Sequence, residues 1–136
     1  MPVSVDPSSY GFIRGVGAEA FLEMCRGASV ILPNLDEGIV LTGTDDPEQI
    51  VSRLSNRFPV VALKLGARGS LGVASARTSN LVSAEPVDTI QVDTNGAGDA
   101  FNAGFVVEYL RGTGLAQALR RGNELGALAV SRRGAR

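Results

Sequence analysis

The chain has 136 residues, of which 44% are hydrophobic, and its 13 basic and 14 acidic residues give a formal net charge of −1. That length fits one domain with a core of its own, and the charge balance argues against a nonspecific binder of nucleic acid or membrane surfaces. The sequence has no histidine and only one cysteine, which excludes a His-based triad and a zinc site. It shows neither a signal-peptide pattern nor an apolar run long enough to span a membrane. Together with the single cysteine, this predicts a cytoplasmic protein.

Strands and helices are predicted to alternate along the chain. In chain order we expect a strand at 3–5, a helix at 17–26, a strand at 29–32, helices at 34–41 and from Asp46-Pro47 to Leu54, strands at 60–65, 69–74 and 78–82, and helices at 97–110 and 115–131. Cys25 falls near the end of the first helix, where a small half-buried hydrophobe is a better interpretation than a reactive thiol. The alternation predicts an α/β sandwich around a mostly parallel sheet.

The stretch DTNGAGDAF, residues 93–101, stands between an extended segment and a helix. Backbone N–H groups of Gly96, Ala97 and Gly98 have no partner inside that helix, and with the helix dipole they form an anion site. Asp99 would repel a resting phosphate there, but it can accept a proton from a hydroxyl that attacks the phosphorus. The alternative is a first-turn acid that the helix dipole favours.

The same stretch resembles the signature Asp-Thr-x-Gly-Ala-Gly-Asp of the ribokinase-like sugar kinases, the phosphofructokinase-B (pfkB) family. The resemblance implies an ATP-dependent carbohydrate kinase with a three-layer α/β/α sandwich. It also implies that Asp99 is the catalytic base that meets the substrate hydroxyl. Gly96, Ala97 and Gly98 would then form the anion hole for the transferred γ-phosphoryl group.

The segment ILPNLDEG carries a second motif of that family, Asn-x-x-Glu, at Asn34 and Glu37. In the family this motif organises magnesium and the nucleotide phosphates. The resemblance therefore implies that Asn34 contacts ATP and that Glu37 holds Mg²⁺ through water. A structural alternative is a capping box, in which Asn at a helix N-cap pairs with Glu three residues on. Both interpretations can hold together.

The segment KLGARGS, residues 64–70, follows the strand predicted at 60–65. It resembles the Gly-x-x-Gly loop that lies against ATP in the family, which implies that Gly66 and Gly69 contact the nucleotide. Lys64 would neutralise phosphate charge. A tight turn into the next strand explains the two glycines equally well.

The segment RGNELGALAVSRRGA, residues 121–135, resembles the family helix that packs on adenine, most of all in the branch that phosphorylates 2-keto-3-deoxygluconate. Asn123 is implied to contact the base. Small residues around Gly126 would admit a flat ring, or would let the helix pack closely on the sheet. Asp93, with the carbonyl of Asn95, is implied to bind a monovalent cation such as K⁺.

Members of this family are considerably longer, and their N-terminal half supplies a lid and most sugar contacts. The chain, residues 1–136, is therefore predicted to be the C-terminal nucleotide-binding and catalytic part, with the lid missing. Asp6 is implied to meet the substrate, although Asp6-Pro7 also fits a plain turn. The expected partners are ATP, a small sugar or sugar acid, and a second copy of the chain or a separate N-terminal half.

Two alternatives to a working kinase stay open. One is a truncated nucleotide-binding pseudokinase, because water reaches the transferred group where a lid is lacking. The other is a dinucleotide-binding oxidoreductase domain. It is disfavoured because no GxGxxG pattern follows the first strand and no acid stands at the expected spacing.

Overall fold

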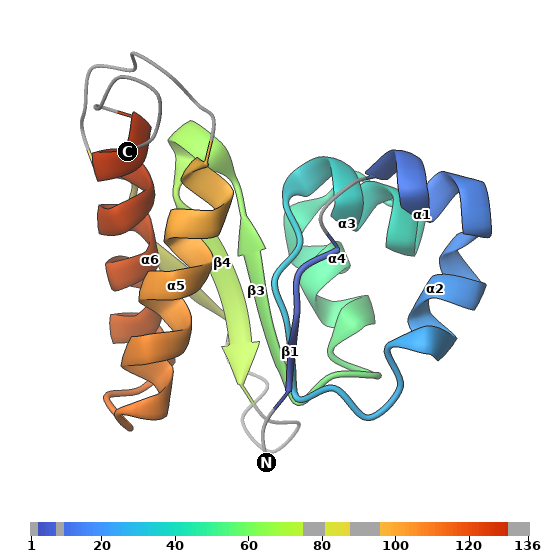
Figure 1. The fold of residues 1–136 in the computed structure, drawn as a ribbon, viewed down its shortest axis with the longest axis horizontal. Helices are drawn as coiled ribbons and strands as arrows, with labels where there is room; N and C mark the ends of the chain where they lie inside the picture. The colour runs from blue at the N-terminus through green and yellow to red at the C-terminus, as the bar shows by residue number, and fades with distance from the viewer. Residues whose placement is uncertain (1–2, 8–9, 75–80, 88–95, 131–136) are drawn as a thin grey trace. The chain divides into compact units, whose positions relative to one another are not determined.

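The computed structural model of the protein describes the chain except residues 1–2, 8–9, 75–80, 88–95 and 131–136 (Figure 1). The chain divides into two compact units. Unit 1 comprises residues 1–64 and 71–81, and unit 2 comprises residues 65–70 and 82–136. The expectation of a single domain over 1–136 stays a prediction.

Unit 1 combines short parallel strands with helices. Its elements are β1 (Ser4–Val5), α1 (Tyr10–Val16), α2 (Ala18–Met24), β2 (Val30–Ile31), α3 (Leu35–Thr42), α4 (Pro47–Leu54), β3 (Val60–Lys64) and all but the first residue of β4 (Ser70–Ala74). The strands lie in the order β1–β2–β3–β4. β2 pairs in parallel with both β1 and β3, so that Val30 aligns with Ser4 on one side and with Val60 on the other. The carboxyl ends of β1, β2 and β3 therefore meet at one edge of the sheet.

The core of unit 1 centres on β3. Residues 61–63 of this strand are fully buried, as expected for a parallel strand covered on both faces. α3 and α4 pack beside β3, and Ile50 and Val51 of α4 are fully buried as well (Figure 1). α4 begins where the sequence predicted it, because Asp46 accepts a hydrogen bond from the Glu48 N–H at 3.1 Å and Pro47 occupies the first helical position.

Unit 2 is built on two long helices that run side by side (Figure 1). Its elements are η1 (Gly66–Arg68), β5 (Val82–Ala84), α5 (Ala97–Leu110) and α6 (Leu115–Val130). A Cβ atom added to Gly122 would lie 2.7 Å from the Phe101 ring, and one added to Gly104 would lie 2.9 Å from the Arg121 carbonyl oxygen. Glycine thus lets α5 and α6 approach each other closely.

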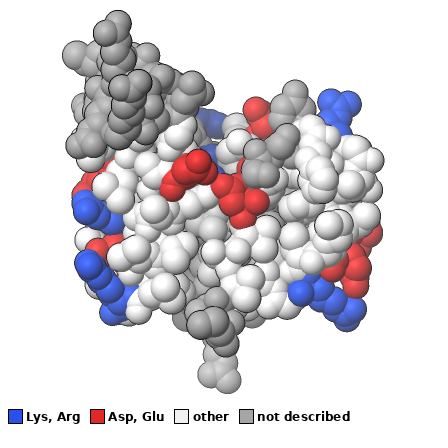
Figure 2. All heavy atoms as spheres, in the orientation of Figure 1, with Lys and Arg blue, Asp and Glu red and all other residues white. Residues whose placement is uncertain are grey.

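Basic side chains line the edge of unit 2 formed by α6 and the end of α5 (Figure 2). Arg111 pairs with Glu108 at 3.2 Å, and Arg121 pairs with Glu124 at 3.1 Å. Pairs of this kind on an exposed surface contribute little to stability, so this edge is a solvated face with locally balanced charge.

Among the described residues, no helix is both long and apolar enough to cross a bilayer.

Most predicted helices and strands are present, with ends that agree within two residues, but two regions differ more. The helix predicted at 17–26 is α2, which ends at Met24, and α1 precedes it where no helix was predicted. The strand predicted at 78–82 lies mainly in 75–80, outside the described residues. β5 begins at Val82.

Candidate functional site

Three of the predicted site residues in unit 1 stand at the ends of neighbouring parallel strands. Asp6 follows β1, and Asn34 follows β2 and forms a parallel bridge with Lys64, the last residue of β3. The Lys64 Nζ lies 3.9 Å from the Asp6 Oδ1, and the Lys64 side chain is only 11% exposed. Open α/β sheets bind their ligands at this carboxyl edge. The structure thus brings these three residues together where a ligand is expected.

The N-terminus of α3 carries the Asn-x-x-Glu motif. The Asn34 Oδ1 accepts a hydrogen bond from the Glu37 N–H at 2.8 Å, and the Glu37 Oε1 accepts one from the Asn34 N–H, also at 2.8 Å. This is a complete capping box. The structural alternative for the motif is therefore confirmed, and the nucleotide and metal roles of the same residues stay predictions.

Glu37 is buried, with 3% of its surface exposed. Burial raises the pKa of its carboxyl group above the ordinary value, because desolvation disfavours the charged form. The hydrogen bond from Asn34 and the positive charge of Lys64 act in the opposite direction on this pKa. A positive charge brought to this edge of the sheet would favour the ionised carboxylate further.

The environment of Glu37 fits a magnesium ion held through water. One carboxylate oxygen already serves the helix cap, and the side chain is buried, so direct coordination is disfavoured. Among the described residues, no three His, Cys, Asp or Glu side chains gather closely enough to hold a metal ion. Mg²⁺ in kinases keeps several waters and is bound by one or two carboxylates together with substrate phosphates, so it needs no larger protein cage.

The glycine-rich turn of unit 2 forms the start of α5. Gly96 is the N-cap, with φ of 80° in the left-handed region that favours glycine, and its carbonyl accepts a hydrogen bond from the Ala100 N–H at 2.9 Å. The N–H groups of residues 97–99 have no partner within the helix, and no described side chain caps them. Gly98 and Asp99 are exposed. The turn thus offers free amide donors with a carboxylate beside them.

The Gly-x-x-Gly loop of unit 2 is a single turn of 3₁₀ helix, closed by a hydrogen bond of 2.9 Å from the Leu65 N–H to the Gly69 carbonyl. Gly66 and Gly69 both have positive φ, at 60° and 89°. A Cβ atom on Gly69 would lie 2.1 Å from the Ala84 carbonyl oxygen, so no other residue fits there. The tight-turn interpretation is confirmed, and a nucleotide contact of the two glycines stays a prediction.

Asn123 lies on α6 with 8% of its surface exposed. Its Nδ2 donates to the Ala84 carbonyl at 3.2 Å and to the Glu85 carbonyl at 2.9 Å. Both hydrogens of the amide are thus used by the backbone that leaves β5. Within the described part of the chain, no residue donates to its Oδ1, so this acceptor is the atom through which Asn123 can contact a base.

The predicted cation ligand Asp93, together with Asn95, lies outside the described residues.

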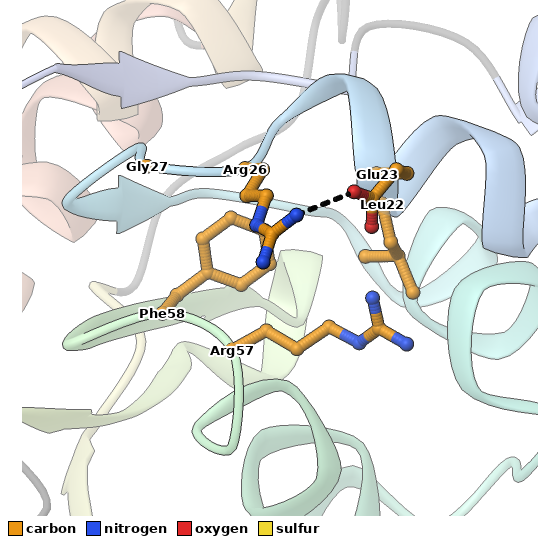
Figure 3. A pocket seen from close by; sticks show the side chains of 6 residues that line it. All are labelled: Leu22, Glu23, Arg26, Gly27, Arg57 and Phe58. Carbon is orange, nitrogen blue, oxygen red and sulfur yellow. Dashed lines mark hydrogen bonds and ion pairs between the residues drawn. The ribbon is translucent and has the colours of Figure 1, made fainter.

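A surface hollow of about 260 Å³ lies elsewhere in unit 1 (Figure 3). It is lined by Leu22, Glu23, Arg26, Gly27, Arg57 and Phe58. Arg26 pairs with Glu23 at 3.0 Å, as drawn in Figure 3, and Arg57 pairs with Glu19 at 2.6 Å. None of the predicted site residues lines this hollow, and carboxylates already neutralise its two guanidinium groups.

The profile described as "pfkB family carbohydrate kinase" matches residues 1–136, the whole chain. The chain belongs to the pfkB family of carbohydrate kinases. One curated pfkB relative, an uncharacterized sugar kinase from Archaeoglobus fulgidus, is 35% identical over 134 residues, which are 98% of this chain and 52% of that protein. Another, a 2-dehydro-3-deoxygluconokinase from Bacillus subtilis, is 36% identical over 104 residues, which are 76% of this chain and 32% of that protein.

A solved structure agrees with this assignment to the pfkB family. A putative ribokinase II from E. coli, solved in complex with ATP and Mg²⁺, superposes with a TM-score of 0.83 at 26% identity. The superposition covers 98% of this chain and 44% of that one. The predicted ribokinase-like α/β fold with a mostly parallel sheet is therefore confirmed. The chain spans about half or less of the length of the pfkB relatives it matches.

Sequence reasoning missed two features of the pfkB chain that depend on distant contacts. It did not predict which way the Lys64 side chain points, and the structure places its ammonium group beside Asp6. It did not single out Ser70, whose hydroxyl is buried without a hydrogen-bond partner among the described residues. The glycine before Ser70 was the available signal, because it marks a close approach of two backbone segments.

Proposed function

We propose that this chain is the nucleotide-binding and catalytic part of an ATP-dependent carbohydrate kinase. The observation that carries the proposal is the first turn of α5. There, N–H groups without a partner among the described residues follow the left-handed Gly96, and Asp99 is exposed beside them. Phosphoryl transfer needs one group to hold negative charge and another to take a proton, and this turn offers both.

In the proposed reaction, a sugar hydroxyl oxygen attacks the γ-phosphorus of ATP. The new O–P bond forms while the bond from the γ-phosphorus to the bridging oxygen breaks, and ADP leaves with that electron pair. Asp99 accepts the hydroxyl proton as general base. The backbone N–H groups of Gly96, Ala97 and Gly98 hold the charge on the transferred oxygens.

The nucleotide phosphates and their metal are assigned to the carboxyl edge of unit 1. Asn34 and Lys64 would contact the ATP phosphates, and Glu37 would hold Mg²⁺ through water. The capping box supports this assignment, because it fixes the Glu37 carboxylate by a hydrogen bond of 2.8 Å. A bound Mg²⁺ would neutralise phosphate charge during the transfer.

The adenosine part of ATP is assigned to unit 2. Gly66 and Gly69 allow close approach of the nucleotide to their loop. The free acceptor of Asn123, its Oδ1, suits the amino group of adenine. The solved relative that carries ATP and Mg²⁺ supports this choice of nucleotide and metal.

The acceptor is proposed to be a hydroxyl of a small sugar or sugar acid. The match to a protein named 2-dehydro-3-deoxygluconokinase supports a sugar acid. Asp6, at the carboxyl edge of the sheet, is assigned to that substrate. We also propose that Asp93 binds a monovalent cation such as K⁺. The proposed location of the protein is the cytoplasm.

A second candidate is a nucleotide-binding module without catalysis. In that case a second copy or a separate N-terminal half would complete the kinase. Consumption of ATP that depends on an added sugar separates the two candidates.

The proposal is tested by measuring ADP formation by the purified chain with Mg-ATP and a panel of sugars and sugar acids. Asp99→Asn is expected to lower sugar-dependent turnover by about 100-fold or more, because a positioned general base contributes roughly 10²–10⁴-fold. Asp45→Asn, the same change at an exposed aspartate between α3 and α4, is the control and should leave turnover unchanged. Equal turnover of the Asp99→Asn variant and the wild type would refute the proposed role of Asp99.

A further inference from the structure

Helix α6 lies close to the chain on both sides of the glycine-rich turn of unit 2. The upstream flank is Ala84–Glu85 and the downstream flank is Ala97, the first residue of α5. We propose that Asn123 and Gly126 of α6 are positioning residues that hold the first turn of α5, residues 96–99, in the geometry that binds phosphate. The inference rests on the proposed function of that turn. It assigns α6 a role in phosphate binding that is separate from any contact with a base.

Asn123 holds the upstream flank. Its Nδ2 donates to the carbonyls of Ala84 and Glu85, which lie 39 and 38 residues away in the sequence, at the end of β5. An amide group is suited to this task, because it brings two donors without a charge to bury. The same backbone is confined from another direction by Gly69, where an added Cβ would lie 2.1 Å from the Ala84 carbonyl oxygen and 2.9 Å from the Pro86 nitrogen.

Gly126 holds the downstream flank. A Cβ atom added there would lie 3.3 Å from the carbonyl oxygen of Ala97 and 3.8 Å from the Cβ of Phe101. Ala97 is the first residue of α5 and belongs to the candidate anion hole. The backbone of α6 at Gly126 therefore lies so close to the first turn of α5 that an added methyl group would press on it.

The spacing of the two residues on α6 explains how one helix serves both flanks. Residues three apart lie on the same face of a helix, so Asn123 and Gly126 face the same way. Asn123 fixes the chain at Ala84–Glu85, before the turn, and Gly126 fixes it at Ala97, within the turn. Donors that are already in place cost less to order when an anion binds.

The first test uses the full chain without nucleotide. In Asn123→Asp, a carboxylate oxygen replaces the Nδ2 donor and faces two carbonyl oxygens. The backbone amide NMR signals of residues 97–99 should then shift. Gln117→Glu makes the same chemical change earlier on α6, where the side chain accepts from Arg120 at 3.1 Å, and should leave those signals in place.

Gly126→Ala provides a variant that should stay folded, because alanine favours the helix while its Cβ presses on Ala97. Its signals at 97–99 should also shift. If those signals keep their wild-type positions in both Asn123→Asp and Gly126→Ala, α6 does not position the turn and the inference is wrong.

The second test measures binding of Mg-ATP to the same variants. Asn123→Asp should raise the Kd for Mg-ATP about tenfold or more, and Gln117→Glu should leave it unchanged. Asn123→Gln, which keeps both donors, should recover part of the affinity, whereas a merely destabilising change would give no such recovery. A wild-type chain that binds no Mg-ATP would refute the proposed function, and the NMR shifts would still decide whether α6 positions the turn.

Discussion

At the scale of single residues, Glu37 has a structural role in the helix cap and a proposed role in binding Mg²⁺, and one substitution can separate the two. The structure shows its carboxylate oxygen accepting from the Asn34 N–H in the helix cap, and the proposed function adds Mg²⁺ through water. Glu37→Gln keeps an oxygen in the same place and removes the charge. We expect thermal stability to stay near the wild-type value, because the cap is preserved and the cost of burying a charge is removed.

The affinity of the Glu37→Gln variant for ATP should, in contrast, lose most of its dependence on Mg²⁺. Calorimetric titrations with ATP at several magnesium concentrations would measure this, alongside thermal unfolding. Glu37→Ala is the companion variant, and loss of the hydrogen bond from the Asn34 N–H to the Glu37 carboxylate should cost about 1 kcal/mol of stability. A Glu37→Gln variant with the magnesium dependence of the wild type would leave this residue with a structural role alone.

Cys25 illustrates a residue whose character the sequence could predict. It is half-buried near the end of α2, and burial raises the pKa of its thiol. A raised pKa lowers the fraction of reactive thiolate at neutral pH. This agrees with the interpretation of Cys25 as a small hydrophobe.

At the scale of helices and strands, α3 is pressed against α4 and β3 at Gly38. A Cβ atom there would lie 2.8 Å from the Ile50 Cγ2 and 3.3 Å from the Leu63 Cδ1. Gly38→Ala is therefore expected to lower the free energy of unfolding. Overpacking costs about 1–3 kcal/mol, and the better helix propensity of alanine offsets up to about 1 kcal/mol of that.

Gly15→Ala is a matched control in the same unit. Gly15 also lies in a helix, α1, but a Cβ atom there would meet nothing within 4 Å. This variant should gain up to about 1 kcal/mol from helix propensity. Urea unfolding of both variants measures the difference. A Gly38→Ala variant as stable as Gly15→Ala would mean that α3 does not pack as tightly as described.

The elements that could be predicted are those with strong local signals. Asp46 and Pro47 marked the start of α4, and the glycine-rich turn marked the start of α5. α1 was missed because its seven residues include Gly11 and Gly15, which weaken the helical pattern. β1 and β2 are shorter than predicted, since strand ends depend on pairing with neighbours that local patterns do not reveal.

At the scale of the whole molecule, the family could be predicted because four motifs occur together in one order. The contacts within the candidate site could not be predicted, because they join residues that are distant in the sequence. The pair formed by Lys64 and Asp6, and the bonds from Asn123 to the end of β5, both depend on the fold bringing such residues together. The motifs therefore predicted which residues belong to the candidate site, and the structure shows which residues they contact.

We propose that this chain binds Mg-ATP and that Asp99 acts in phosphoryl transfer and not in ATP binding. Calorimetric titration of the purified 136-residue chain and of its Asp99→Asn variant with Mg-ATP tests both statements. We predict that both proteins bind, with dissociation constants that differ by less than about tenfold, since Asp99 acts on the hydroxyl proton. Absence of binding in a well-folded sample of the wild-type chain would show that it is not the nucleotide-binding part of a kinase.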